Sequence, residues 1–280
     1  MIKEEIKELS DEELNSLTTA IKGRYGIDFT NYEPKSLKRG FARLIMKKQL
    51  GSVLGLWSKI MKDREFIKDC IDDLTVNLTE LFRNPEIWIK IQKDIIPQLK
   101  NKFPINIWHA GCSSGEEVYT MAIVLQNSEL LRKTKTLATD LSNRILAEAI
   151  RGEYPSYLLN KYSKSFNEYL PKENMNSFFD LEDGKAIVKD FLRKHIEFRQ
   201  HNLAQDPMER KFNLVFCRNV MIYFDEALKI KVLRMFHQSL EKDGYLIVGY
   251  YDMMPEASKE MFEVIDAKTR IYKKINKIFK

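Results

Sequence analysis

Apolar residues recur at helical spacing through the first seventy residues. One stripe comprises Leu9, Leu14, Leu17 and Ile21. Ser10 precedes the acidic run 11–13, and a hydroxyl followed by acidic residues is typical of a helix N-terminus. We therefore expect residues 1–72 to form a small all-α domain, which begins with a helix near Ser10.

A second amphipathic helix is predicted over residues 34–50. Its apolar side comprises Leu37, Phe41, Leu44 and Ile45, and a separate stripe comprises Lys35, Arg39, Arg43 and Lys47. Residues 35–68 carry 10 basic and 2 acidic side chains, whereas residues 1–34 carry 4 basic and 8 acidic ones. A solvated face is the simpler interpretation of this stripe. The alternative is a docking surface for an acidic helix or a nucleic acid.

From residue 105 onward, short apolar runs alternate with helical stretches, a pattern that predicts βαβ units and a parallel sheet. The expected strands are 105–110, 136–139, 213–217 and 245–249, and a helix over 226–240 precedes the last of them. Residues 151–212 do not fit the alternation. We expect 178–181 and 196–199 to be short strands of a subdomain inserted at roughly residues 155–200 of a second domain, 73–280.

Composition narrows the class of protein further. With 44% apolar and 31% charged residues, the 280-residue chain is long and apolar enough for a sizeable core. No apolar run approaches a membrane span, and the first residues lack a secretory leader, so we expect a cytoplasmic protein without membrane insertion. Cys70, Cys112 and Cys217 form no CxxC pair, and the 4 histidines show no metal-binding spacing, so we expect no metal site.

The end of the first predicted strand carries the chemistry of a nucleoside site. Two glycines, at 111 and 115, allow a ligand to approach the backbone closely, but no lysine follows to hold a phosphate. Glu116 and Glu117 would repel a phosphate and attract a positively charged ligand. Asp140 ends the second strand, where α/β folds place an acid that holds ribose hydroxyls.

Three ordered motifs then resemble a known family. They read LTVNLTELFRNPE at 74–86, IWHAGCSSGEE at 107–117 and FCRNVMIYFD at 216–225. Their order and relative spacing resemble the chemotaxis receptor methyltransferases of the CheR type. The resemblance implies an α/β fold: a Rossmann-like S-adenosylmethionine-dependent methyltransferase domain with an inserted small β-subdomain, preceded by a small all-α domain.

The resemblance also implies the reaction and its residues. Members of this family transfer a methyl group from S-adenosylmethionine to glutamate side chains on the cytoplasmic helices of chemoreceptors, leaving S-adenosylhomocysteine. Arg83 and Tyr223 match the family residues nearest the transferred methyl group. The implied cofactor-binding residues are Asn77, Thr79, Arg83, Gly111, Glu117, Asp140, Asn202, Leu203, Cys217, Arg218 and Asn219. Since a glutamate is ionised at neutral pH, the task is positioning and desolvation rather than base catalysis.

The resemblance to this family also suggests a binding partner for the basic stripe. We expect Arg39, Arg43 and Lys47 to steer the acidic helical bundle of a receptor. The family's pentapeptide-binding loop corresponds to residues 180–185, which are short and contain one glycine, so we expect no tight pentapeptide binding. After Gly249, the sequence Tyr-Tyr-Asp replaces the family's His-Ser-Glu, and we expect an altered pocket rim.

Two other functions stay open at this point. One is a methyltransferase of the same fold with another acceptor, which the replaced His-Ser-Glu segment allows. The other is a non-catalytic S-adenosylmethionine-binding sensor or adaptor, against which the presence of Arg83 and Tyr223 argues. We do not expect a nucleic-acid partner, because the basic patch is confined to one helix. We expect a monomer.

Overall fold

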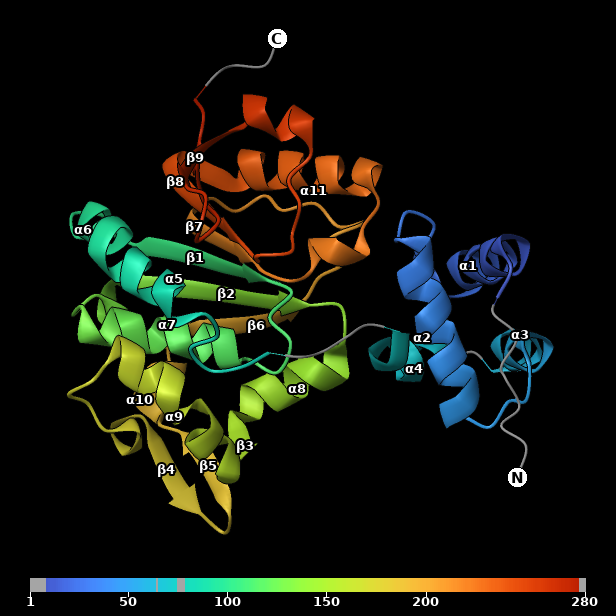
Figure 1. Ribbon diagram of the computed structural model, residues 1–280, viewed down its shortest axis with the longest axis horizontal. Helices are drawn as coiled ribbons and strands as arrows, with labels where there is room; N and C mark the ends of the chain where they lie inside the picture. The colour runs from blue at the N-terminus through green and yellow to red at the C-terminus, as the bar shows by residue number, and fades with distance from the viewer. Residues whose placement is uncertain (1–8, 64, 75–78, 277–280) are drawn as a thin grey trace.

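The computed structural model describes residues 9–63, 65–74 and 79–276, in which a helical bundle lies beside a larger α/β domain (Figure 1). The helices of the bundle are α1 (Asp11–Tyr25), α2 (Pro34–Lys47), α3 (Val53–Lys62) and α4 (Phe66–Leu74). Their apolar faces enclose a common core that includes Leu17, Phe41, Ile60 and Ile67. The expected small all-α domain is therefore confirmed.

Local sequence explains where α1 begins and ends. The Ser10 hydroxyl accepts a hydrogen bond from the Glu13 N–H, and the Glu13 carboxylate accepts one from the Ser10 N–H, which forms a capping box. All four residues of the apolar stripe are buried. Gly26, at φ 70°, ends the helix in the left-handed conformation.

Helix α2 carries the basic stripe. Its first turn is fixed by Pro34 and by the Glu33 carboxylate, which accepts hydrogen bonds from the backbone of Lys35 and Ser36. The predicted apolar side is buried in the bundle, and Lys35, Arg39, Arg43 and Lys47 are exposed. The helix ends at Lys47, three residues before the predicted end.

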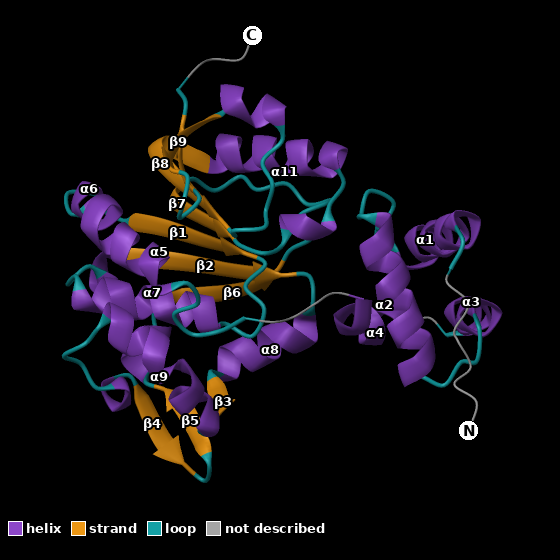
Figure 2. Ribbon diagram, in the orientation of Figure 1, coloured by secondary structure: helices purple, strands orange, loops and turns teal. Residues whose placement is uncertain are grey.

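Among the described residues, the α/β domain contains a seven-stranded sheet in the order β6-β2-β1-β7-β8-β10-β9 (Figure 2). The strands from β6 to β8 pair in parallel, and the last two pairings are antiparallel. The bounds are β1 (Ile105–Ala110), β2 (Thr134–Asp140), β6 (Ile196–Gln200), β7 (Phe212–Cys217), β8 (Leu240–Val248), β9 (Phe262–Asp266) and β10 (Ile271–Lys274). The predicted parallel α/β fold is confirmed.

Helices cover both faces of this sheet. One face packs on α5 (Pro85–Lys90), the π-helical turn η1 (Ile91–Ile95), α6 (Ile96–Leu99) and α7 (Glu116–Asn127), and α9 (Tyr157–Tyr169) packs against α5. The other face packs on α11 (Glu226–Ser239), where Val232 and Phe236 contact the core around Trp108 and Leu246. The edge near β6 is covered by α8 (Asn143–Arg151). The remaining short helices are η2 (Leu131–Lys133), η3 (Met175–Ser177), α10 (Asp190–Arg193), η4 (Met221–Tyr223) and η5 (Glu256–Glu260).

The inserted segment forms a separate small antiparallel sheet in the order β3-β5-β4. Its strands are β3 (Glu153–Pro155), β4 (Phe179–Glu182) and β5 (Lys185–Val188). The expected strand at 178–181 belongs here, but the placement of 196–199 in the same subdomain was wrong. That strand is β6, which pairs with β2 at the edge of the large sheet. A short apolar run does not specify which sheet it joins.

One other strand differs from its prediction. β8 begins at Leu240 rather than Tyr245, so residues 240–244 also belong to the strand. The pairing of β7 with β8 shifts register between Phe212 and Leu214, which accommodates these exposed residues.

The helical bundle contacts the α/β domain through a short backbone bridge. Tyr32 pairs with Phe224 as an isolated antiparallel bridge. The Glu33 N–H donates to the Tyr223 carbonyl at 2.8 Å, and the Asp225 N–H donates to the Asn31 carbonyl at 2.9 Å. The loop before α2 is therefore joined to the loop before α11.

Candidate active site

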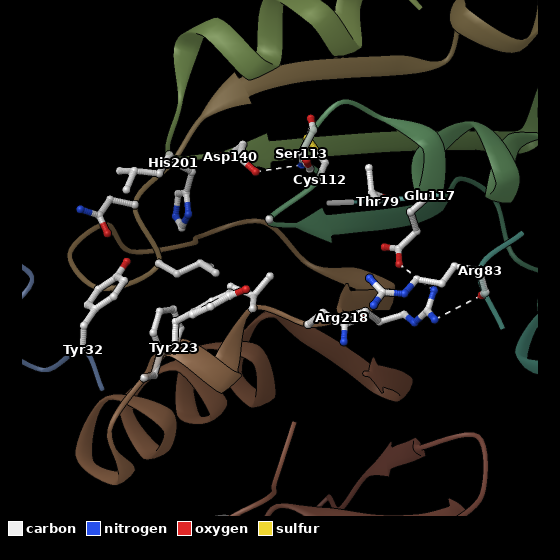
Figure 3. A pocket seen from close by; sticks show the side chains of 17 residues that line it. Tyr32, Thr79, Arg83, Cys112, Ser113, Glu117, Asp140, His201, Arg218 and Tyr223 are labelled. Atoms are coloured by element: carbon white, nitrogen blue, oxygen red, sulfur yellow. Dashed lines mark hydrogen bonds and ion pairs between the residues drawn. The ribbon is translucent and has the colours of Figure 1, made fainter. Parts of the chain in front are cut away.

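A cavity lies at the carboxyl edge of the large sheet, where the chain order reverses between β1 and β7. Such a switch point is where open α/β sheets bind ligands. The cavity encloses about 880 Å³, including the part that is open to solvent. Its walls come from residues 79–83, 111–117, 140–141, 201–203 and 218–224, together with Tyr32 of the helical bundle (Figure 3).

The turn after β1 forms one wall of the cavity with its backbone. Gly111 has φ 86°, and a Cβ atom at this position would lie 2.5 Å from Val220 Cγ2. The N–H groups of Gly111 and Cys112 both donate to the Thr139 carbonyl at 2.8 Å, which ties the turn to β2. Glycine is therefore required here, because the turn passes directly against the neighbouring loop.

Asp140, at the end of β2, is held by backbone donors. Its two carboxylate oxygens accept hydrogen bonds from the Ser113 N–H at 2.9 Å and the Ser142 N–H at 3.1 Å. The side chain lines the cavity beside the glycine turn. This is the position at which an acid holds ribose hydroxyls in nucleotide-binding α/β folds.

Glu117 belongs to a buried charge network at the other end of the cavity. Its carboxylate lies 3.0 Å from His109 Nδ1 and 3.0 Å from a terminal nitrogen of Arg218. Burial raises the pKa of Glu117, but the hydrogen bond with His109 and the charge of Arg218 outweigh burial, so the pKa lies below its ordinary value. Glu117 therefore presents a negative charge to the cavity at neutral pH.

Arg218 connects this network to the segment before α5. Its other terminal nitrogen donates to the Asn84 side-chain oxygen at 2.8 Å and to the Arg83 carbonyl at 3.3 Å. The indole N–H of Trp88 donates to the same carbonyl, at 3.1 Å. The Phe82 N–H donates to the Thr120 hydroxyl of α7. The backbone on either side of Arg83 is thus fixed while its side chain lines the cavity.

The loop that carries Tyr223 is organised by a buried carboxylate. Asp252, which is fully buried, accepts hydrogen bonds from the N–H groups of Asn219 (2.6 Å), Gly249 (2.8 Å) and Ile222 (3.0 Å). Burial raises the pKa of Asp252 even though these bonds oppose the rise. A Cβ atom on Gly249 would lie 2.7 Å from both Asn219 N and an Asp252 oxygen. No side chain fits between the strand end and this loop.

Charges of both signs act on the hydroxyl of Tyr223. Burial and the charge of Asp252 raise the pKa of Tyr223, while the charges of Arg43, Arg83 and Arg39 act to lower it. Arg83 comes from the segment before α5, and the other two arginines come from α2. Because the pKa is raised, the hydroxyl stays protonated at neutral pH.

The cavity collects most of the residues expected from the sequence. Those lining it are Thr79, Arg83, Gly111, Glu117, Asp140, Asn202, Leu203, Arg218, Asn219 and Tyr223. Cys217 is not among them: it is fully buried in the core of the sheet, where burial raises the pKa of its thiol. Asn77 lies outside the described residues. The contacts that these residues make with a ligand remain predictions.

Some lining residues were missed. They are Tyr32, Cys112, Ser113, Leu141, His201, Val220 and Phe224. All but one of them flank a motif residue in the sequence, so adjacency was a usable signal. Tyr32 is far from every motif, and only the folded chain brings it to the cavity.

The expected change of the pocket rim at Tyr250 and Tyr251 was wrong. The Tyr250 hydroxyl hydrogen-bonds the Glu86 carboxylate at the start of α5, and Tyr251 is 75% exposed. Neither residue lines the cavity. Asp252, the third residue of the segment, accepts the backbone hydrogen bonds that organise the Tyr223 loop.

Comparison with known proteins identifies the family. Residues 77–271 match the family model for the CheR methyltransferase SAM-binding domain, and residues 12–75 match that for the CheR methyltransferase all-alpha domain. The chain belongs to the CheR methyltransferase family. It is an S-adenosylmethionine-dependent methyltransferase, as the sequence motifs predicted.

Similar curated proteins cover most of the chain. The chemotaxis protein methyltransferase of Listeria innocua is 34% identical over 234 residues, which are 83% of this chain and 86% of that protein. The chemotaxis protein methyltransferase of Borreliella burgdorferi is 32% identical over 256 residues, which are 86% of this chain and 88% of that protein. The described part of this CheR family member contains no helix long and apolar enough to cross a membrane.

The cavity fits S-adenosylmethionine, the cofactor of this family. The cofactor has a positively charged sulfonium and amino group, and the cavity offers the carboxylate of Glu117. Its ribose hydroxyls match the carboxylate of Asp140. Two lining side chains also carry a buried polar atom without a partner among the described residues, Ser113 Oγ and His201 Nδ1. A close-approaching glycine turn and polar groups without partners suit a ligand with hydroxyls and amines.

Proposed function

We propose that this chain transfers the methyl group of S-adenosylmethionine to glutamate side chains on the cytoplasmic helices of methyl-accepting chemoreceptors, which forms methyl esters. The names of its relatives support methylation in chemotaxis. The observation that favours a carboxylate as acceptor is that the guanidinium side chain of Arg83 lines the same cavity as Tyr223. A cation at this place favours an anionic acceptor over a neutral amine or alcohol.

Arg83 and Tyr223 would hold the acceptor. S-adenosylmethionine supplies an already activated methyl group. A glutamate is ionised at neutral pH, so no group on the chain has to remove a proton from it. The Arg83 guanidinium can donate charge-assisted hydrogen bonds to the carboxylate, and the Tyr223 hydroxyl, which keeps its proton, can donate another. These residues would align the oxygen with the methyl group and exclude water.

The cavity offers charged groups to both ligands. Glu117 and Asp140 would present carboxylates to the cofactor, and Arg83, which also lines the cavity, would attract the carboxylate of the acceptor. Arg218 is already paired with Glu117, so we assign it no part in holding the acceptor.

We propose that α2 docks the receptor, through the stripe Arg39, Arg43 and Lys47. Two of these side chains act electrostatically on Tyr223, so a helix bound along the stripe would place its glutamates near the cavity. Lys47 already forms an ion pair with Asp73 of α4. We therefore assign the larger share of receptor binding to Arg39 and Arg43.

We also propose that methylation does not require a receptor pentapeptide. Strands β4 and β5 are joined by the two-residue turn Asp183-Gly184, in which both residues have positive φ (46° and 76°). In a hairpin this tight, the connection between the strands is too short to close over a peptide. Docking through α2 would then provide the receptor affinity.

The experiment that tests the acceptor is transfer of labelled methyl from S-adenosylmethionine to receptor-containing membranes, followed by release of volatile methanol in base. Glutamyl esters hydrolyse under these conditions, and N-methyl groups do not. We expect base-labile label on the receptor, and Arg83→Ala should lower turnover by orders of magnitude while the fold, followed by thermal unfolding, stays intact. Base-stable label, or wild-type turnover in Arg83→Ala, contradicts the proposal.

The docking surface is tested by reversing charge. The double variant Arg39→Glu/Arg43→Glu should weaken receptor methylation at least tenfold with unchanged affinity for S-adenosylhomocysteine. Lys164→Glu/Lys172→Glu makes the same change of net charge at exposed positions of the insertion and should leave methylation unchanged. Equal losses in the two double variants would mean that net charge, rather than α2, governs the reaction.

A further inference from the structure

The helical bundle supplies a wall of the cofactor cavity. The backbone bridge between residues 31–33 and 223–225 brings Tyr32 to the cavity, where its side chain lies among the lining residues. Figure 3 shows Tyr32 beside His201 and Tyr223. No other residue of the bundle lines the cavity among the residues that the structure describes.

The ring of Tyr32 is held from two sides. It packs edge-to-face against Phe29 of the bundle, with ring centroids 5.0 Å apart, and against Phe224 of the α/β domain, at 5.1 Å. Both partners are buried. The ring is therefore positioned by packing, independently of any bond that its hydroxyl makes.

The hydroxyl of Tyr32 is left for a ligand. Within the described part of the chain, no hydrogen bond engages Tyr32 Oη. Burial raises the pKa of Tyr32, and the charge of Asp140 raises it further, so the group is a neutral O–H donor at physiological pH. Asp140, which ends β2 where the ribose is expected, lines the same cavity as Tyr32, and so do Asn202 and Leu203.

We propose that Tyr32 is a cofactor-binding residue, whose hydroxyl donates a hydrogen bond to the adenosine part of S-adenosylmethionine. The helical bundle then contributes to cofactor binding as well as to receptor docking. This inference rests on the cofactor and not on the proposed acceptor. Its test contains no receptor, so the two proposals fail separately.

The test is calorimetric titration of the full chain with two ligands that share the adenosine part. S-adenosylhomocysteine carries the amino acid end, and 5′-methylthioadenosine lacks it. Tyr32→Phe keeps the ring packing and removes only the hydroxyl. We expect it to weaken both ligands about threefold to tenfold, the range for one net hydrogen bond. An unchanged affinity overturns the proposal, and so does a loss confined to S-adenosylhomocysteine.

Tyr25→Phe is the matched control. Tyr25 also belongs to the helical bundle, but its hydroxyl lies within hydrogen-bond distance of the Ile60 and Asp63 carbonyls and does not line the cavity. We expect Tyr25→Phe to lower the thermal stability of the bundle and to leave both affinities unchanged. If Tyr25→Phe weakens the ligands as much as Tyr32→Phe does, the loss is a general effect of loosening the bundle and the proposal is wrong.

Discussion

Glu116 and Glu117 begin α7 side by side, yet their replacement by glutamine should change stability in opposite directions. The Glu116 side chain is buried, and the Ser114 hydroxyl donates a hydrogen bond to its carboxylate at 2.7 Å. Burial raises the pKa of Glu116 from 4.5 to about 7, although that hydrogen bond opposes the rise. Ionisation of Glu116 therefore lowers the free energy of unfolding, and Glu116→Gln removes this loss of stability.

The sign and size follow from proton linkage. Between pH 4.5 and about 7 the folded chain keeps the proton of Glu116 and the unfolded chain loses it, so the wild-type free energy of unfolding falls as pH rises through this window. At about 1.4 kcal/mol per pKa unit, the shift amounts to about 3 kcal/mol above pH 7. At pH 5 the same relation gives less than about 1 kcal/mol. Glutamine does not titrate, so the variant lacks this dependence.

The assay is urea unfolding at pH 5 and pH 8, followed by the fluorescence of Trp88 and Trp108, which are buried in the α/β domain. Glu116→Gln should be more stable than wild type by about 3 kcal/mol at pH 8 and by less than about 1 kcal/mol at pH 5. A stability difference that is the same at both pH values refutes the reasoning, and so does a variant that is less stable at pH 8.

Glu117→Gln is the control on the adjacent residue. It removes the charge that partners Arg218, which is buried, and leaves that guanidinium without a counter-charge. We expect destabilisation at pH 8, because breaking a buried ion pair from one side is costly. Stabilisation by both substitutions would mean that relief of charge at the helix start, rather than burial of Glu116, is responsible.

Three further predictions concern catalysis and recognition. Gly249→Ala places a Cβ atom 2.7 Å from Asn219 N, so it should displace the Tyr223 loop, cost about 1–3 kcal/mol in thermal unfolding and lower turnover; wild-type values for both would contradict this. If α2 docks the receptor through exposed charges, as proposed, raising the salt concentration should raise the KM for receptor several-fold without changing the affinity for S-adenosylhomocysteine. A receptor pentapeptide should show no submicromolar binding in calorimetry, and submicromolar affinity would disprove the proposed pentapeptide independence.

Much of the fold could be predicted because its signals are local. β1 coincides with the apolar run 105–110, and α11 ends one residue from its predicted end. Residues 196–199 form a strand as expected, but this strand, β6, joins β2 through pairing across about sixty residues, which a short apolar run does not encode. The hairpin β9–β10 was missed because its two strands are short and do not alternate apolar and polar residues regularly.

The site residues likewise fall into those with a local sequence signal and those without one. Residues within the motifs, such as Arg83 and Asp140, were found because short segments carry both the strand end and its side chain. From the sequence, Asp252 was noted only as one residue of a segment that differs from the family. In the structure, its carboxylate accepts hydrogen bonds from the N–H groups of Asn219 and Ile222, about thirty residues away. Tyr32 reaches the cavity by docking of the bundle, across more than 100 residues from Asp140. Contacts of that kind become visible only in three dimensions.

The backbone bridge between the helical bundle and the loop that carries Tyr223 has a consequence for how such a protein can evolve. Both hydrogen bonds that flank Tyr32 join main-chain atoms, Glu33 N to Tyr223 O and Asp225 N to Asn31 O. Any residue other than proline supplies those donors, so substitution at either surface leaves the joint intact. With docking through α2 as proposed, the exposed face of α2 is free to diversify toward new receptors while the loop that carries Tyr223 stays attached to the helical bundle. Recognition and chemistry can drift at different rates within one chain.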